Sequence, residues 1–275
     1  MRRRFQQVDA FTATATRGNP VAVVLDGAEL TDDQMQAVAR WTNLSETTFV
    51  LAPTDRAADY RLRIFTPGAE LDFAGHPTLG TCHAWLTVGV PRSPDAIVQE
   101  GAVGHVRLRR SDSRLAFAAP PMTAADPDPD VLAATVAALG LAAGAVERAQ
   151  VLDNGTAWLA LLVGDAASVL ALEPDHEALR ALPKVGVVGR RPDGDAAVEV
   201  RAFAASVGIT EDPVTGSLQA SVAQWLTAAG DLPGQYVAAQ GTCIGREGRV
   251  HIERVGEDVW VGGGTHTVVD GTIDI

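Results

Sequence analysis

The sequence is poor in cysteine and in basic residues. Its 275 residues include two cysteines, Cys82 and Cys243, which cannot form a disulfide framework, so we expect a reducing compartment. Lys and Arg total 22 against 34 for Asp and Glu, a net charge of -12, and Lys184 is the single lysine. This balance argues against a protein that binds nucleic acid or an anionic membrane, because both need a basic surface.

Long apolar runs are also missing. No uninterrupted apolar stretch approaches the length of a membrane-spanning helix. No apolar run follows the basic start at residues 1–4, so we expect no signal peptide and a cytoplasmic protein. Aromatic residues make up 5% of the chain, yet hydrophobic residues reach 47%, which is enough for a substantial core.

Several catalytic motifs do not occur. The sequence has no Walker A loop, no complete Gly-x-Gly-x-x-Gly after a strand and no Gly-x-Ser-x-Gly elbow. Its histidines have no carboxylates or cysteines at metal-ligand spacing, so we predict no metal site. Neither cysteine is placed at a helix start, which argues against a thiol epimerase. Acid–base chemistry without a cofactor is what remains.

Hydrophobic patterning predicts an α+β fold. Before residue 120 the strands are short and numerous, and helices are few, with expected helices at 30–42 and 78–86. The Pro- and Asp-rich segment 119–130 is a candidate linker. We therefore predict a first half at 1–118, completed by the C-terminal strand, and a second half at 119–275. Gly262, Gly263 and Gly264 are interpreted as a bulge or turn.

Two segments half a chain apart resemble each other. Each has an expected strand, an irregular loop, a helix that starts with small residues, and a Trp-Leu pair at the end of that helix. Such a repeat predicts two domains of one topology related by a pseudo-twofold axis. The alternative is that strand-to-helix units are common and the likeness is chance. The matching parts are residues 60–65, Gly75 and Trp85 in the first segment, and residues 198–203, Gly216 and Trp225 in the second.

Helix starts made of small residues suit an anion. Their backbone N–H groups are unpaired, and the helix dipole is positive there. If the helices that start near Gly75 and Gly216 face each other across a cleft between the halves, they would bind a carboxylate or a developing enolate. Symmetry therefore predicts an active site in that cleft.

The residues near these helix starts are candidates for proton transfer. Glu46 lies where a polar loop meets an apolar strand, and partial desolvation there would favour proton uptake. His76 could donate a hydrogen bond or shuttle a proton. The alternatives stay open at this point: a surface role for Glu46, a packing role for His76, and helix capping for Asp212 and Ser217.

Four stretches in this order resemble the PhzF-like family, the phenazine-biosynthesis isomerases with a diaminopimelate-epimerase-like fold. Residues 240–241 and 245–250 also fit, so the resemblance covers nearly the whole chain. It implies two similar halves, each with a curved mixed sheet around a central helix, and a homodimer. The four stretches are residues 8–11 with 18–20, residues 45–50 (Ser-Glu-Thr-Thr-Phe-Val), residues 73–80 (Phe-Ala-Gly-His-Pro-Thr-Leu-Gly) and residues 211–217 (Glu-Asp-Pro-Val-Thr-Gly-Ser).

The resemblance also implies roles for residues. Glu46 would be the catalytic acid/base that moves a proton within a small carboxylic acid, without a cofactor or metal. His76 and Asp212 would assist proton movement, and Gly75, Gly216 and Ser217 would bind the substrate. Gln219 stands where the family commonly has histidine, and Cys82 lies in the first helix. Both departures from the family pattern bear on the subgroup and the substrate of this protein more than on its chemistry.

Two other functions remain open. The first is an epimerase or racemase, in which Glu46 and either Asp212 or His76 would be opposed bases. The second is a protein of the same fold that binds a small molecule without catalysis. Exchange of substrate protons with solvent distinguishes the binding protein, and inversion of a stereocentre distinguishes the epimerase.

Overall fold

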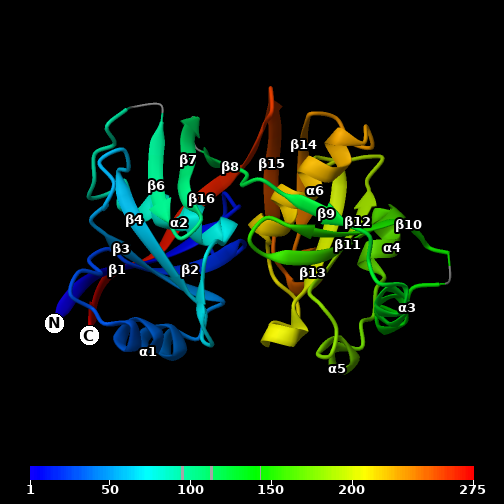
Figure 1. Ribbon diagram of the computed structural model, residues 1–275, viewed down its shortest axis with the longest axis horizontal. Coiled ribbons are helices and arrows are strands. Elements are labelled where there is room, and N and C mark those ends of the chain that lie inside the picture. The colour runs from blue at the N-terminus through cyan, green and yellow to red at the C-terminus, as the bar shows by residue number, and fades with distance from the viewer. Residues whose placement is uncertain (94–95, 112–113, 143) are drawn as a thin grey trace. The chain divides into compact units, whose positions relative to one another are not determined.

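The structure is a computed structural model, and it describes residues 1–93, 96–111, 114–142 and 144–275. The chain forms two compact units (Figure 1). Unit 1 comprises Met1–Ala118 and Trp260–Ile275, and unit 2 comprises Ala119–Val259. The boundary at Ala119 coincides with the start of the Pro- and Asp-rich segment.

Unit 1 is a closed barrel of mixed strands. Among its described residues, eight strands follow the order β1-β2-β3-β4-β6-β7-β8-β16, and β16 pairs back onto β1. The pairs β2–β3 and β4–β6 are parallel, and short β5 extends β4. The strands are β1 (Arg2–Ala10), β2 (Asn19–Val24), β3 (Glu46–Leu51), β4 (Tyr60–Phe65), β5 (Glu70–Leu71), β6 (Ile97–Gly101), β7 (Gly104–Ser111), β8 (Arg114–Ala118) and β16 (Asp258–Asp274).

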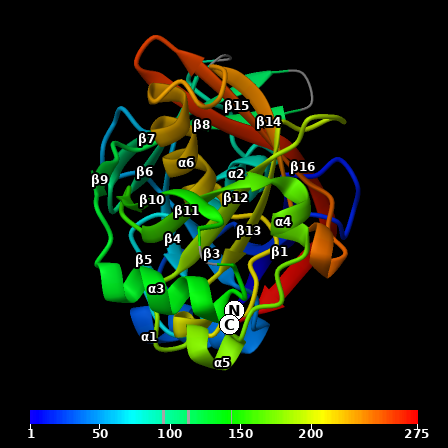
Figure 2. The same cartoon turned by 90° about the vertical axis from the view of Figure 1, so that its right-hand side faces the viewer.

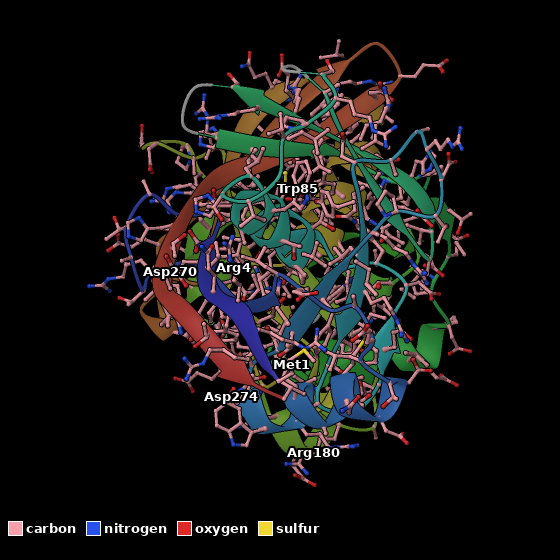
Figure 3. All side chains as sticks on the ribbon, turned by 90° about the vertical axis from the view of Figure 1, so that its left-hand side faces the viewer. Met1, Arg4, Trp85, Arg180, Asp270 and Asp274 are labelled. Carbon is pink, nitrogen blue, oxygen red and sulfur yellow. The ribbon has the colours of Figure 1, made fainter. Side chains whose placement is uncertain are left out.

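The barrel closes where the two ends of the chain meet. Arg2 pairs with Asp274 and Ala10 with Thr265 along antiparallel β1 and β16. Figure 3 shows these strands side by side, with Met1 beside Asp274, and Trp85 inside the ring of strands. Closure removes the free sheet edges that would otherwise be open to other chains.

Helix α2 (Gly75–Trp85) fills the barrel. Ten of its residues are buried, and it contacts β1, β2, β3, β4 and β8. Its small residues permit this close approach: a Cβ on Gly80 would lie 2.3 Å from Cγ1 of Val21. Helix α1 (Asp32–Thr42) packs Met35 and Ala39 against Phe49, and a capping box between Thr31 and Gln34 starts it.

Unit 2 has a second mixed sheet around a second central helix. Its strand order is β15-β14-β13-β12-β11-β10-β9, with parallel pairs β11–β12 and β13–β14. Its strands are β9 (Thr123–Ala125), β10 (Val146–Asp153), β11 (Ala157–Asp165), β12 (Val185–Arg190), β13 (Val198–Phe203), β14 (Gln235–Gln240) and β15 (Gly248–Val255).

Helix α6 (Gly216–Ala228) is the central helix of unit 2, with ten buried residues. It contacts β10, β11 and β15. Figure 2 shows α3 and α5 together at one end of this unit. The predicted α+β fold with two similar halves is confirmed. The other helices are α3 (Pro129–Ala138), α4 (Ala166–Leu170), α5 (His176–Leu179), and two 3₁₀ turns, η1 (Ala205–Val207) and η2 (Thr242–Ile244).

The prediction of a bulge or turn at Gly262–Gly264 is wrong. These glycines lie within β16 and pair in register with β8. The reason for glycine here is a close approach of neighbouring backbone. A Cβ on Gly262 would lie 2.6 Å from the carbonyl oxygen of Leu115, and one on Gly264 would lie 2.6 Å from that of Thr12.

Candidate active site

Glu46 is the first residue of β3 and is buried. Its side chain belongs to a strand that pairs in parallel with β2, and Thr47 and Thr48 beside it are fully buried. Glu46 itself is 8% exposed, so the surface role left open by the sequence does not apply. A carboxylate in this position has lost most of its hydration.

His76 lies directly against Glu46. Its Nε2 atom is 3.1 Å from Oε2 of Glu46, although the approach lacks the alignment of a regular hydrogen bond. Catalytic hydrogen bonds are often poorly aligned before substrate binds. On the other side of the ring, Nδ1 lies 3.2 Å from Nδ2 of Asn19. The imidazole is therefore held between a carboxyl group and an amide.

The imidazole of His76 is neutral at physiological pH. Burial lowers the pKa of His76 to about 3, and a hydrogen bond with the backbone of Pro20 offsets part of that effect. The contact with Glu46 is consequently one between a neutral ring and a carboxyl group. A neutral imidazole carries one N–H donor and one acceptor nitrogen, so it can hydrogen-bond with Glu46 either as a carboxylate or as a carboxylic acid.

Helix α2 begins beside this pair without a side-chain cap. The preceding residue, Ala74, has no capping group, and the first intrahelical hydrogen bond runs from the Thr78 N–H to the Ala74 carbonyl. The backbone N–H groups of Gly75 and His76 thus belong to the unpaired first turn. This end of α2 places donors and a positive dipole next to Glu46.

In unit 2, Asp212 lies in the loop before α6. Its Oδ2 atom accepts a hydrogen bond of 2.7 Å from the hydroxyl of Thr215, and its backbone N–H donates to the Ala202 carbonyl at 2.9 Å. Gln240 donates to the Asp212 carbonyl at 3.1 Å and to the Thr215 hydroxyl at 2.8 Å. Thr215, the N-cap residue of α6, makes no side-chain cap; its hydroxyl donates to Asp212 and accepts from Gln240.

Ser217 accepts hydrogen bonds through both its side chain and its backbone. Its Oγ accepts a hydrogen bond of 3.1 Å from the Trp158 indole, and its carbonyl accepts one of 2.9 Å from Asn154. Because an indole N–H only donates, the bond to Trp158 does not use the Ser217 hydroxyl hydrogen. Gly216, the first residue of α6, precedes it at an N-terminus that lacks a side-chain cap, as in α2.

The structure thus brings Glu46, His76 and Gly75 together in unit 1. Asp212, Gly216 and Ser217 lie together in unit 2. Sequence reasoning missed the supporting residues. Asn19 was part of a turn signal, and no local pattern connects Gln240 with the loop before α6. These partners are Asn19, Trp158, Thr215, Gln219 and Gln240.

The two cysteines are not part of either group. Cys82 is fully buried in α2, and burial raises the pKa of its thiol to about 12. Cys243 is exposed in η2. Within the described ranges, no cluster of three or more His, Cys, Asp or Glu residues could hold a metal ion. The helices of those ranges are too short or too polar to cross a membrane.

Residues 8–271 match the model of a family described as phenazine biosynthesis-like protein. The chain belongs to this family. It is 36% identical, over 92% of its length and 91% of the relative's, to a trans-2,3-dihydro-3-hydroxyanthranilate isomerase of Pseudomonas aeruginosa.

Solved structures share the whole fold. A PhzF-family protein of Bacillus anthracis has a TM-score of 0.85 at 22% identity, with both chains fully covered. A predicted epimerase of Pseudomonas aeruginosa has a TM-score of 0.81 at 28% identity, over 98% of this chain and 99% of the other. These findings confirm the predicted family and its place among isomerases and epimerases.

Proposed function

We propose that this chain is an isomerase that moves a proton between two carbons of a small carboxylic acid, with Glu46 as the acid/base. The observation that carries the proposal is the 3.1 Å contact between buried Glu46 and neutral His76. A single carboxyl group that takes a proton and returns it leaves the redox state of the substrate unchanged. The reaction itself therefore requires no oxidant or reductant.

His76 supports both protonation states of Glu46. When Glu46 is a carboxylate, the proton of His76 on Nε2 donates toward Oε2, and Nδ1 accepts from the Asn19 amide. When Glu46 has taken a proton, its O–H donates to Nε2 of the other neutral tautomer, in which the ring proton lies on Nδ1. The imidazole remains neutral in both states. A change of tautomer thus stabilises Glu46 first as a base and then as an acid.

The other predicted residues bind the substrate or assist the proton transfer in this proposal. The N–H groups of the uncapped helix starts at Gly75 and Gly216 and the hydroxyl of Ser217 suit a carboxylate or an enolate oxygen. Asp212, which accepts from Thr215, would assist proton movement within the substrate. From the family resemblance we also expect a homodimer in the cytoplasm.

The test is a panel of small unsaturated and hydroxylated carboxylic acids incubated in deuterated water and read by NMR. We expect one acid to be isomerised with exchange of a carbon-bound proton. Glu46→Gln should lower the turnover of that acid by roughly 10²–10⁴-fold with the fold intact. Glu29→Gln is the matched control, because Glu29 is an exposed glutamate of the same unit. Full turnover by Glu46→Gln contradicts the proposal.

The likeness to a predicted epimerase favours a second candidate. An epimerase would use Glu46 and a second base, Asp212 or His76. The same panel separates the two, because an epimerase incorporates deuterium with inversion of a stereocentre and moves no double bond. Binding of an acid without any exchange would indicate a protein that does not catalyse.

A further inference from the structure

Among the described residues, the same cluster of three side chains occurs in each unit. In unit 1, the Arg63 guanidinium lies over the Phe65 ring, 5.0 Å from its centre. Arg63 also donates two parallel hydrogen bonds to Glu70, Nε to Oε1 and Nη2 to Oε2, each of 2.7 Å. We call Arg63, Phe65 and Glu70 the clamp of unit 1. A bidentate arginine–carboxylate pair of this kind fixes the orientation of the two side chains as well as the distance between them.

The clamp of unit 2 consists of Arg201, Phe203 and Glu211. Arg201 lies 5.0 Å from the centre of the Phe203 ring, and its two hydrogen bonds to Glu211 are 3.0 and 2.8 Å long. In each unit the arginine precedes its phenylalanine by two positions on β4 or β13. In each unit the glutamate stands five positions before the first residue of the central helix. The clamps therefore tie the segment that leads into α2 or α6, which in unit 1 includes β5, to a strand of the same unit.

The two clamps differ in burial. The side chains of Arg201 and Glu211 are 6% and 7% exposed, against 17% and 42% for Arg63 and Glu70. Arg201 also donates to the Leu172 carbonyl at 2.8 Å. Burial of a charged pair costs desolvation that its mutual attraction often fails to offset, so stability is a weak reason to bury this one.

The clamps also differ in the residue that follows the glutamate. Unit 1 has Leu71 there and unit 2 has Asp212, each four positions before the first residue of the central helix. In unit 2, β13 holds this segment at two adjacent points. Arg201 binds the Glu211 side chain, and the Ala202 carbonyl accepts the Asp212 N–H at 2.9 Å. The buried clamp is thus coupled to the carboxylate through one peptide unit.

We propose that Arg201 and Glu211 are positioning residues that fix the Asp212 carboxylate, while the clamp of unit 1 is followed by Leu71 at the matching position. The consequence for catalysis rests on the function proposed above for Asp212. Arg201 acts through Glu211 and the backbone; Thr215 donates to the Asp212 carboxylate, and Gln240 donates to the Asp212 backbone carbonyl. A displacement of about 1 Å in a reacting group can reduce rate about 10²-fold.

The test compares Arg201→Lys and Glu211→Gln with Arg63→Lys. Lysine keeps the positive charge of Arg201 but cannot form the bidentate hydrogen bonds to Glu211. We expect kcat, on the acid that the panel identifies, to fall by about 10–100-fold in the unit 2 variants with little change in KM. The Arg63→Lys control should fall much less.

A double variant, Arg201→Met with Glu211→Leu, separates positioning from stability. Replacement of a buried ion pair by apolar residues often restores stability. We expect its Tm to return toward that of the wild type while kcat stays low. Recovery of kcat together with Tm, or an equal loss of kcat in Arg63→Lys, would overturn the proposal.

A second readout needs no substrate. In protein labelled with ¹³C at aspartate carboxyl groups, the Asp212 resonance is assigned from its loss in Asp212→Asn. We expect this resonance to shift in Arg201→Lys and Glu211→Gln and to stay in place in Arg63→Lys. An unmoved Asp212 resonance refutes the positioning role. Absence of proton exchange by the wild-type protein refutes the proposed function instead, and the NMR result still decides the role of the clamp.

Discussion

Acidification should destabilise the wild-type protein more than a variant that lacks His76. Burial lowers the pKa of His76 from 6.5 to about 3. Between these two pH values the unfolded chain therefore binds a proton at His76, whereas the folded chain does not. The contribution of this neutral histidine to stability is complete above pH 6.5 and is lost as the pH falls toward 3.

The size of the loss follows from the two pKa values. With 1.36 kcal/mol for each pKa unit, the free energy of unfolding should fall by about 1.4 kcal/mol at about pH 5.5 and by about 2.7 kcal/mol at about pH 4.5. The limit below pH 3 is roughly 5 kcal/mol. Other groups titrate in the same range, so the quantity to compare is the difference between two proteins.

The assay is urea unfolding of the wild type and of His76→Gln at several values between about pH 7.5 and about pH 5.5. This range lies above the isoelectric point of about 4.9, where solubility falls. Glutamine removes the titrating group and keeps a side-chain N–H donor near Glu46. The wild type should lose about 1.4 kcal/mol more than the variant. Equal slopes, or a smaller loss for the wild type, would mean that His76 is an imidazolium paired with Glu46, and the tautomer argument would be refuted.

Two further predictions concern α2 and the cysteines. Gly80→Val should reduce the free energy of unfolding, measured by chemical denaturation, by about 1–3 kcal/mol, because a Cβ there would lie 2.3 Å from Cγ1 of Val21. A variant as stable as the wild type would contradict the close packing of α2. In the native protein at neutral pH, a thiol reagent should modify exposed Cys243 and leave Cys82 intact until the chain unfolds. Peptide mapping by mass spectrometry would show which cysteine is modified. Modification of Cys82 before unfolding would contradict its burial and raised pKa.

Local patterns predicted the elements that carry the site. The alternation at residues 60–65 matches β4, in which inward side chains are buried, and Glu46 is the first residue of β3 as expected. The expected helix at 78–86 begins earlier, at Gly75, because Pro77 is tolerated in the first turn. This earlier start places His76 inside the helix, beside Glu46.

Contacts between distant segments were beyond sequence reasoning. Asn19 reaches His76 across 57 positions, and Gln240 reaches Thr215 across 25. Such pairs depend on strand order, which hydrophobic periodicity does not encode. The same limit explains the error at Gly262–Gly264, where the reason for glycine is a neighbouring strand and a loop far away in the chain.

The pairing of β1 with β16 has a consequence for synthesis on the ribosome. Residues 265–274 complete the first barrel, yet they are translated after all of unit 2. Unit 1 begins to emerge first but must wait for residues 265–274 before it can close, while unit 2 is uninterrupted in the chain and can fold earlier. The nascent barrel meanwhile presents an open strand edge, so the period before these residues emerge is when chaperones would matter most.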